Sequence, residues 1–282
     1  MKKPLFWVYL QGKMQKIAKY IILALIPVLF ACSDYNKVLK SKNPQVKYKK
    51  AMELYGKKDY LRAVGLYDQL RDLYKTSDSM ETIYFYSAMS YYQLKDYQYA
   101  SMFFKDYTDN FDKSHRFIEC SYMGLYCDFL AIGSYELDQS ETKHVMEALQ
   151  TFTNYYPNSE YTQRCNDHLD VLRAKLQMKE YDQVQQYFKM GEFKAAVTSA
   201  KIAVKLYPDI KQREELEFLT VKAQFIYASN SIERKRKERF EEVLVNFEDY
   251  KYNNDKNSAH YNAALDYKIK AEKEIKLLKE LL

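Results

Sequence analysis

The sequence predicts an all-α protein, a right-handed superhelical solenoid of about five helix pairs followed by one C-terminal helix. An internal repeat supports this prediction, because residues 57–67 are echoed by residues 94–104. In both copies lysine and aspartate precede a tyrosine, an alanine follows three residues later, and an aromatic residue comes four residues after the alanine. Composition agrees, since five prolines and six glycines among 282 residues disfavour strand-and-turn architectures.

Residues 1–31 are typical of a secretory signal peptide and are set apart from the folded protein. Three lysines (13, 16 and 19) precede an apolar run that is shorter than the about 20 residues of a transmembrane helix. The run ends in Leu29-Phe30-Ala31-Cys32, which resembles the lipobox of bacterial lipoproteins, where the cysteine thiol receives diacylglycerol. The alternative is an ordinary secretory peptide or membrane anchor that happens to end near a cysteine.

We therefore expect a covalent lipid on Cys32 and no other cofactor. Several acyl chains, at about 0.8 kcal/mol per buried methylene, would hold the protein durably on a membrane. Met1 and Met14 are both open as the start of translation.

Removal of the signal peptide changes the charge of the chain. Residues 1–31 contain five lysines and no acidic residue, so 39 basic and 38 acidic residues remain. The mature chain lacks the global basic field that nucleic-acid binding requires. The basic run at 232–239 contains interspersed acids, so a helix surface or a protein contact is favoured there, and no nucleic-acid partner is expected.

The mature chain divides into a polar tether (32–44), a repeat region (45–230) and a divergent end (231–282). Pro44 fits the first turn of a helix, where its missing N–H costs nothing. We expect helix pairs near 45–57 and 59–75, 79–94 and 96–111, 114–132 and 141–155, 160–188 and 192–206, and 211–229 and 232–250. A last helix near 259–281 would cap the array, dock a partner, or do both.

Small and aromatic residues at helical spacing are expected to pack the two helices of each pair together. These packing positions are Ala51, Ala63, Tyr67, Ala88, Ala100, Phe104, Ala196 and Ala200. Their spacing resembles the tetratricopeptide repeat, although the tryptophan and the adjacent glycine usual in that repeat are absent.

The sequence contains no pattern that indicates catalysis. No glycine-rich phosphate loop, paired-cysteine metal site or nucleophile motif occurs, and the four histidines are scattered. Cys120, Cys127 and Cys165 are expected to be buried packing residues. We predict a protein that is not an enzyme and holds no metal.

A binding surface is predicted on the first helix of each of the first two pairs. In tetratricopeptide arrays these helices line the concave face. The residues placed there by register are Tyr48, Met52, Tyr55, Phe85, Met89 and Tyr92. Aromatic and methionine side chains suit an apolar peptide. In the alternative interpretation, half of them belong to the core between repeats.

The whole pattern is similar to the BamD family. The similarity rests on the lipobox cysteine, the short tether, five irregular repeats and the stretch from Asp138-Gln139 to Tyr155-Tyr156-Pro157, and it is most specific between 138 and 208. The bias toward tyrosine and lysine resembles a Bacteroidota member. Beyond residue 210 the family pattern fades.

This resemblance implies a lipoprotein of the outer-membrane β-barrel assembly machine. It implies binding to a BamA-like barrel subunit through that subunit's periplasmic domain, and to the C-terminal signals of unfolded outer-membrane proteins. Ser33 after the cysteine does not resemble a surface-export signal, which favours the periplasmic side of the outer membrane. The alternative from a different class is a lipid-anchored solute-binding component of a nutrient-uptake system, which would require a pocket with convergent polar groups.

Overall fold

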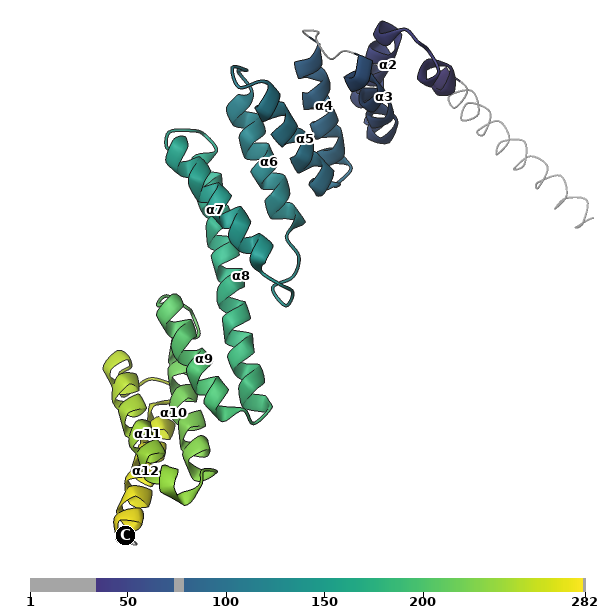
Figure 1. Cartoon of the computed structure of the whole chain (residues 1–282). Coiled ribbons are helices and arrows are strands. Elements are labelled where there is room, and N and C mark those ends of the chain that lie inside the picture. The colour runs from purple at the N-terminus through teal and green to yellow at the C-terminus, as the bar shows by residue number, and fades with distance from the viewer. Residues whose placement is uncertain (1–33, 74–78, 281–282) are drawn as a thin grey trace, which may run out of the picture. The chain divides into compact units, whose positions relative to one another are not determined.

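The computed structural model describes residues 34–73 and 79–280, and all regular secondary structure within these ranges is helical (Figure 1). The expected signal peptide, both candidate start methionines and Cys32 lie outside the described residues. The chain forms two compact units, residues 1–131 and 132–282.

The first unit contains five labelled helices: α2 (Pro44–Gly56), α3 (Tyr60–Leu73), α4 (Met80–Gln93), α5 (Tyr97–Asn110) and α6 (Phe117–Ala131). The second contains α7 (Ser140–Tyr155), α8 (Thr162–Lys189), α9 (Phe193–Leu206), α10 (Arg213–Ser229), α11 (Glu233–Asn253) and α12 (Tyr261–Glu280). Apart from the ends of α3 and α12, which adjoin residues that the structure does not describe, every limit lies within three residues of the sequence prediction, and the all-α fold is confirmed.

Within each unit, helices that are neighbours in sequence pack side by side (Figure 1). All eight predicted packing residues are at most 1% exposed. Alanine is suited to these places because it lets two helix backbones approach, while the buried rings of Tyr67 and Phe104 fill the adjoining space.

The last helix shares a core with its two predecessors. Buried residues of α12, including Ala264, Ala271 and Ile275, belong to the same apolar cluster as Phe240 and Phe247 of α11. α12 also contacts α10. It therefore covers the exposed flank of the final pair, as a terminal element of a repeat array must.

The pairing expected for the third repeat differs in the structure. The helices predicted near 114–132 and 141–155 belong to different units, because the division falls between residues 131 and 132. α6 packs on α5, and α7 packs on α8. Gly124 lies at the first of these contacts, where a Cβ atom would be in van der Waals contact with the Cβ of Phe104 at 3.4 Å.

The repeated sequence signature ends one helix and begins the next. Lys58, Lys95 and Gly191 occupy equivalent positions with φ angles of 62°, 62° and 80°. At each one, the following backbone N–H donates to a carbonyl five residues earlier, as between Asp59 and Leu54 at 2.9 Å. This is the Schellman arrangement, which satisfies carbonyls that the helix end leaves without partners.

The aspartate of the signature then starts the second helix. The Asp96 carboxylate accepts from the Tyr99 N–H at 3.4 Å, and the Asp59 carboxylate accepts from the Arg62 N–H at 3.4 Å. An aspartate at the helix N-cap satisfies an N–H that has no partner within the helix. The turn thus fixes the reversal between the two helices of a pair.

All three cysteines of the described residues are buried and free. Burial raises the pKa of the Cys120 and Cys127 thiols to about 12 and that of Cys165 to about 11. The thiols are therefore protonated packing groups in the folded protein, with little nucleophilic character.

We expect Gly191→Ala to lower the free energy of unfolding by about 1 kcal/mol, because a β-carbon is disfavoured at positive φ. Urea denaturation measures the change. Gly56→Ala is the matched control, since Gly56 is the last residue of α2, lacks a positive φ and leaves open space for a methyl group. An equal loss of stability in both variants would contradict the role of the turn.

We also expect stability to fall above about pH 9. Because the thiol pKa values are raised on folding, the unfolded chain loses these protons first, and the folded state loses stability as the pH rises toward the folded pKa values. For Cys120→Ala, the plot of unfolding free energy against pH between 9.5 and 10.5 should be less steep by about 1.4 kcal/mol per pH unit. An unchanged slope would show that Cys120 ionises equally in both states.

Candidate binding surface

The six predicted surface residues come from α2 (Tyr48, Met52, Tyr55) and α4 (Phe85, Met89, Tyr92). The three α2 side chains are half-buried and pack against the core of the first helix pair. Met89 and Tyr92 are also half-buried and pack against the next cluster. Each of these five side chains therefore exposes part of its surface and has the rest supported by the core.

Phe85 differs from the other five because it is only 7% exposed. The guanidinium of Arg116 lies over its ring at 4.1 Å from the centroid. The repeat register aligns Phe85 with Tyr48, but Phe85 belongs to the buried cluster formed with α5 and α6, whereas Tyr48 is only partly buried beside its own cluster. Phe85 is consequently a core residue, and the surface prediction does not hold for it.

Tyr55 and Tyr92 each contact two further tyrosines in the same way. Tyr55 lies 5.4 Å from Tyr60 and 4.7 Å from Tyr86, measured between ring centroids. Tyr60 begins the second helix of the same pair, and Tyr86 belongs to the first helix of the next pair. Edge-on ring pairs of this kind add to the stabilisation from burial.

The second copy repeats the first. Tyr92 lies 6.1 Å from Tyr97, which starts α5, and 6.2 Å from Tyr126 of α6. In the third copy Phe188 lies 5.5 Å from Phe193. In all three copies, an aromatic residue therefore lies five positions before the aromatic residue that begins the second helix. This spacing is the sequence signal for the ring contact between them.

Tyr86 and Tyr126 are two further half-buried tyrosines, in ring contact with Tyr55 and Tyr92 respectively, that the sequence prediction missed. Tyr86 follows Phe85 directly, so the register of the repeat pointed to the neighbouring position. Tyr126 lies in α6, where the repeat signature is lost, and its ring stacks with Tyr122 and Phe129 at 5.9 and 6.2 Å. We call Tyr55, Tyr86, Tyr92 and Tyr126 the tyrosine row.

Two rings of the tyrosine row, Tyr55 and Tyr92, have hydroxyls whose protonated form is favoured by their surroundings. Burial raises the pKa of the Tyr55 and Tyr92 hydroxyls above their ordinary value. The hydroxyls remain donors, and the ring faces offer apolar area. This combination suits a peptide segment with an apolar or aromatic side chain and free backbone carbonyls.

The first unit has a second surface, formed by residues 34–39 and the helices on which they pack. Residues 34–39 are helical, and Tyr35, Val38 and Leu39 pack against the core of α2 and α3. The Tyr35 hydroxyl donates to the Arg62 carbonyl at 3.2 Å. The segment expected to be a tether is therefore docked on the first helix pair from residue 34 onward.

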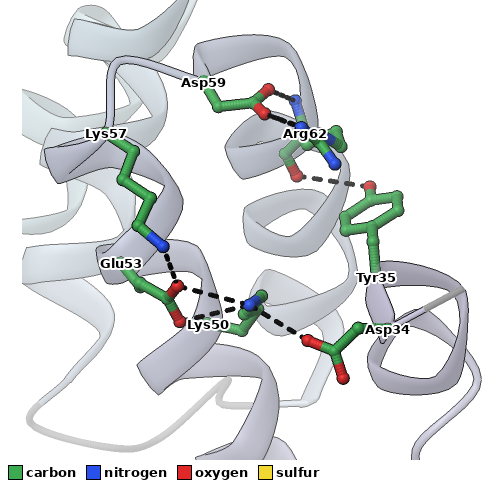
Figure 2. A network of polar contacts seen from close by, with 7 residues as sticks. All are labelled: Asp34, Tyr35, Lys50, Glu53, Lys57, Asp59 and Arg62. Carbon is green, nitrogen blue, oxygen red and sulfur yellow. Dashed lines mark hydrogen bonds and ion pairs between the residues drawn. The ribbon is translucent and has the colours of Figure 1, made fainter. Parts of the chain in front are cut away.

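Figure 2 shows the polar contacts that hold this docked segment. The Lys50 ammonium bridges the carboxylates of Asp34 and Glu53, at 3.2 Å from each, and Lys57 also contacts Glu53 at 2.5 Å. The hydrogen bond to Asp34 raises the pKa of Lys50, and the bonds from Lys57 and Lys50 lower the pKa of Glu53.

The close approach of Tyr35 depends on glycine at position 65 of α3. A methyl group on Gly65 would approach the Tyr35 hydroxyl to 2.8 Å, which would force the ring to move. The Arg62 guanidinium lies 5.8 Å from the centre of the Tyr35 ring, and its Nε donates to Asp59 at 2.6 Å. The signature aspartate thus also orients a group that the docked segment contacts.

The second unit contains an open cavity of about 600 Å³ between α9, α10 and α11. Its lining includes Lys194, Lys201 and Lys205 from α9, opposed by Glu238 and Glu242 from α11. Asn246 also lines it, is 3% exposed, and has no hydrogen-bond partner for its amide among the described residues.

Two properties of the described residues bear on the class of protein. Within 34–73 and 79–280, no group of three or more histidine, cysteine, aspartate or glutamate side chains could hold a metal ion. In the same ranges, no helix has both the length and the apolar character needed to cross a membrane.

Comparison with protein families matches the chain to the YfiO family, described as outer membrane lipoprotein, over residues 40–238. The chain belongs to this family. The YfiO match includes α2 to α10 and the start of α11, and it leaves out most of α11 and all of α12. It continues past position 210, where the sequence prediction placed the end of the family pattern. None of the curated proteins compared with the chain matches it significantly.

Proposed function

We propose that this YfiO-family protein is a BamD-like, non-enzymatic component of the machine that assembles β-barrel proteins in the outer membrane. The observation that carries the proposal is the family match over residues 40–238, which spans both compact units. The tyrosine row adds a physical reason, because it offers a supported, partly exposed apolar surface for another polypeptide.

The proposed place of action is the periplasmic side of the outer membrane. A lipid on Cys32 would attach the chain there, in agreement with a family of outer membrane lipoproteins. The taxonomic proposal, a Bacteroidota protein, rests on the tyrosine and lysine bias of the sequence alone.

The proposed mechanism is binding and positioning. The tyrosine row receives the C-terminal signal of an unfolded barrel protein, and the second unit contacts the periplasmic domain of a BamA-like subunit. Supported rings lose little rotamer freedom when a peptide binds, so more of the contact free energy appears as affinity. Helix pairs held by fixed turns would keep the row in place before the substrate arrives.

We expect the outer-membrane barrel assembly subunit to co-purify with the protein from membranes extracted in mild detergent. Mass spectrometry of the eluate identifies the partner, and a second envelope complex purified in parallel controls for extraction. Repeated absence of a barrel subunit, with the control complex intact, would contradict the proposed function.

We expect Tyr55→Ala combined with Tyr92→Ala to weaken binding of a peptide copied from the C-terminus of an outer-membrane barrel protein by at least about tenfold. The reason is that buried aromatic anchors contribute most of the affinity of such contacts. Fluorescence anisotropy with the labelled peptide measures the change.

The matched control is Tyr155→Ala combined with Tyr252→Ala, since these rings are 76% and 91% exposed and lie on α7 and α11. Circular dichroism melting of both variants checks that the helices remain folded. Equal affinity in the two double variants would remove the tyrosine row as the binding surface.

A further inference from the structure

The basic charge of the mature chain is concentrated beside the proposed lipid anchor. Residues 34–58 contain eight lysines and two acidic residues, which gives a net charge of +6. The mature chain as a whole carries 39 basic and 38 acidic residues, so everything outside this stretch is net negative. The stretch that follows the anchor therefore differs in sign from the rest of the protein.

Three of the eight lysines form hydrogen bonds or ion pairs with other residues of the folded protein. Lys47 is buried and donates to the Leu39 carbonyl at 3.0 Å. Lys50 and Lys57 share the Glu53 carboxylate, as Figure 2 shows. These contacts join the docked segment to α2 and leave the two acidic residues of the stretch, Asp34 and Glu53, neutralised.

The other five lysines are exposed, and none has an ion pair among the residues that the structure describes. They are Lys37, Lys40, Lys42, Lys49 and Lys58. Because the stretch has no spare acid to pair them, their charge is available to an outside partner. We call them the free lysines.

Docking of residues 34–39 keeps the first helix pair close to the anchor. Cys32 lies two residues before Asp34, and a fully extended chain spans at most about 3.6 Å per residue. Asp34 is held by Lys50 on α2, and Tyr35 is held by the Arg62 carbonyl on α3. An acyl chain on Cys32 would therefore bring the first helix pair to the lipid surface.

We propose that the free lysines bind the headgroups of anionic phospholipids, so that the first helix pair rests on the membrane. This inference rests on the lipid at Cys32, which is part of the proposed function. Anionic phospholipid is the occupant that the observations favour, because the stretch is cationic and joined to the anchor, whereas an acidic protein partner would not require that position.

The strength of the contact follows from the number of charges. Each lysine near an anionic bilayer increases membrane partitioning by about fivefold at physiological ionic strength. The attraction extends over a Debye length of about 8 Å at 0.15 M salt, so only residues held near the surface contribute. Because several acyl chains on Cys32 would already attach the chain durably, the lysines would act mainly by holding the first helix pair against the surface.

The test uses the chain from residue 32 with Cys32→Ser, so that only protein groups bind to the membrane. The contacts described above are made by residues from Asp34 onward, and circular dichroism melting verifies the fold of each variant. Sedimentation is measured with vesicles of phosphatidylcholine alone and with vesicles in which about one lipid in three is phosphatidylglycerol. We expect binding only to the anionic vesicles, abolished by about 0.5 M NaCl because salt screens the attraction.

Replacing the five free lysines by glutamine should weaken this binding at least about 100-fold. The matched control replaces five exposed lysines remote in sequence from the anchor, which have no ion pair in the described part of the chain: Lys189, Lys211, Lys256, Lys273 and Lys276. Both variants lose the same net charge, but the control should bind nearly as the parent does. Lys37→Gln with Lys40→Gln and Lys42→Gln leaves α2 intact and should give an intermediate loss.

Equal weakening in the two five-lysine variants, or equal binding to neutral and anionic vesicles, would overturn the proposal. An acidic protein partner in place of lipid would appear as no vesicle binding by the parent chain, which also overturns it. The result is independent of the assembly role, because vesicle binding without co-purification of a barrel subunit would reject that role and retain this inference.

Discussion

The fold depends on a compact turn in which one helix ends, the chain reverses, and the next helix begins with an aromatic ring against the helix just completed. The left-handed residue at Lys58, Lys95 or Gly191 makes the reversal, and the following acidic residue donates its N–H to the carbonyl five residues earlier. In the same turns, the Tyr55 ring packs against the Tyr60 ring and the Tyr92 ring packs against the Tyr97 ring. A lysine in this conformation is disfavoured by about 1–2 kcal/mol, so surrounding contacts must compensate at two of the three copies.

The turn also connects the fold to the candidate surface. Tyr55 and Tyr92 accept a backbone hydrogen bond from the left-handed residue through their carbonyls, and their rings reach the next first helix at Tyr86 and Tyr126. The tyrosine at this position therefore takes part in the turn at the helix end, packs the two helices of its pair together and contributes a partly exposed ring. Changes to the turn and changes to the surface are consequently coupled, and binding measurements on variants require a stability measurement alongside.

The helices could be predicted from sequence because local signals agree: apolar spacing, few glycines and prolines, and a repeated turn motif. The predicted start of α6 is three residues early: residues 114–116 precede the helix and contain a local turn, in which the Arg116 N–H donates to the Ser114 hydroxyl at 3.0 Å. The third pairing could not be predicted, since the choice between α5 and α7 as the neighbour of α6 depends on tertiary packing that helical spacing does not reveal. The burial of Phe85 likewise depends on Arg116, which lies beyond α5 in the chain.

The docking of residues 34–39 is not predicted from the sequence, although the sequence contains the apolar spacing of an amphipathic turn there. Tyr35, Val38 and Leu39 follow the i, i+3, i+4 spacing of an amphipathic turn, but so short a segment with polar neighbours cannot be distinguished from chance. Its docking can be recognised only in the folded structure, where the Tyr35 ring lies close to Gly65 and its hydroxyl donates to the Arg62 carbonyl on α3. The family match starts at residue 40 and so gives no help with it.

The three buried thiols bear on folding in the periplasm, where we propose that the protein acts. Disulfides form readily in the periplasm, and an unfolded chain would present three reactive cysteines to the oxidants there. Once α6 and α8 have packed, Cys120, Cys127 and Cys165 are protonated and shielded, and an uncharged thiol is a poor nucleophile for exchange. Packing of these helices before oxidation would therefore keep the three thiols reduced. Helix pairs joined by short turns make mainly local contacts, and local contacts favour fast folding.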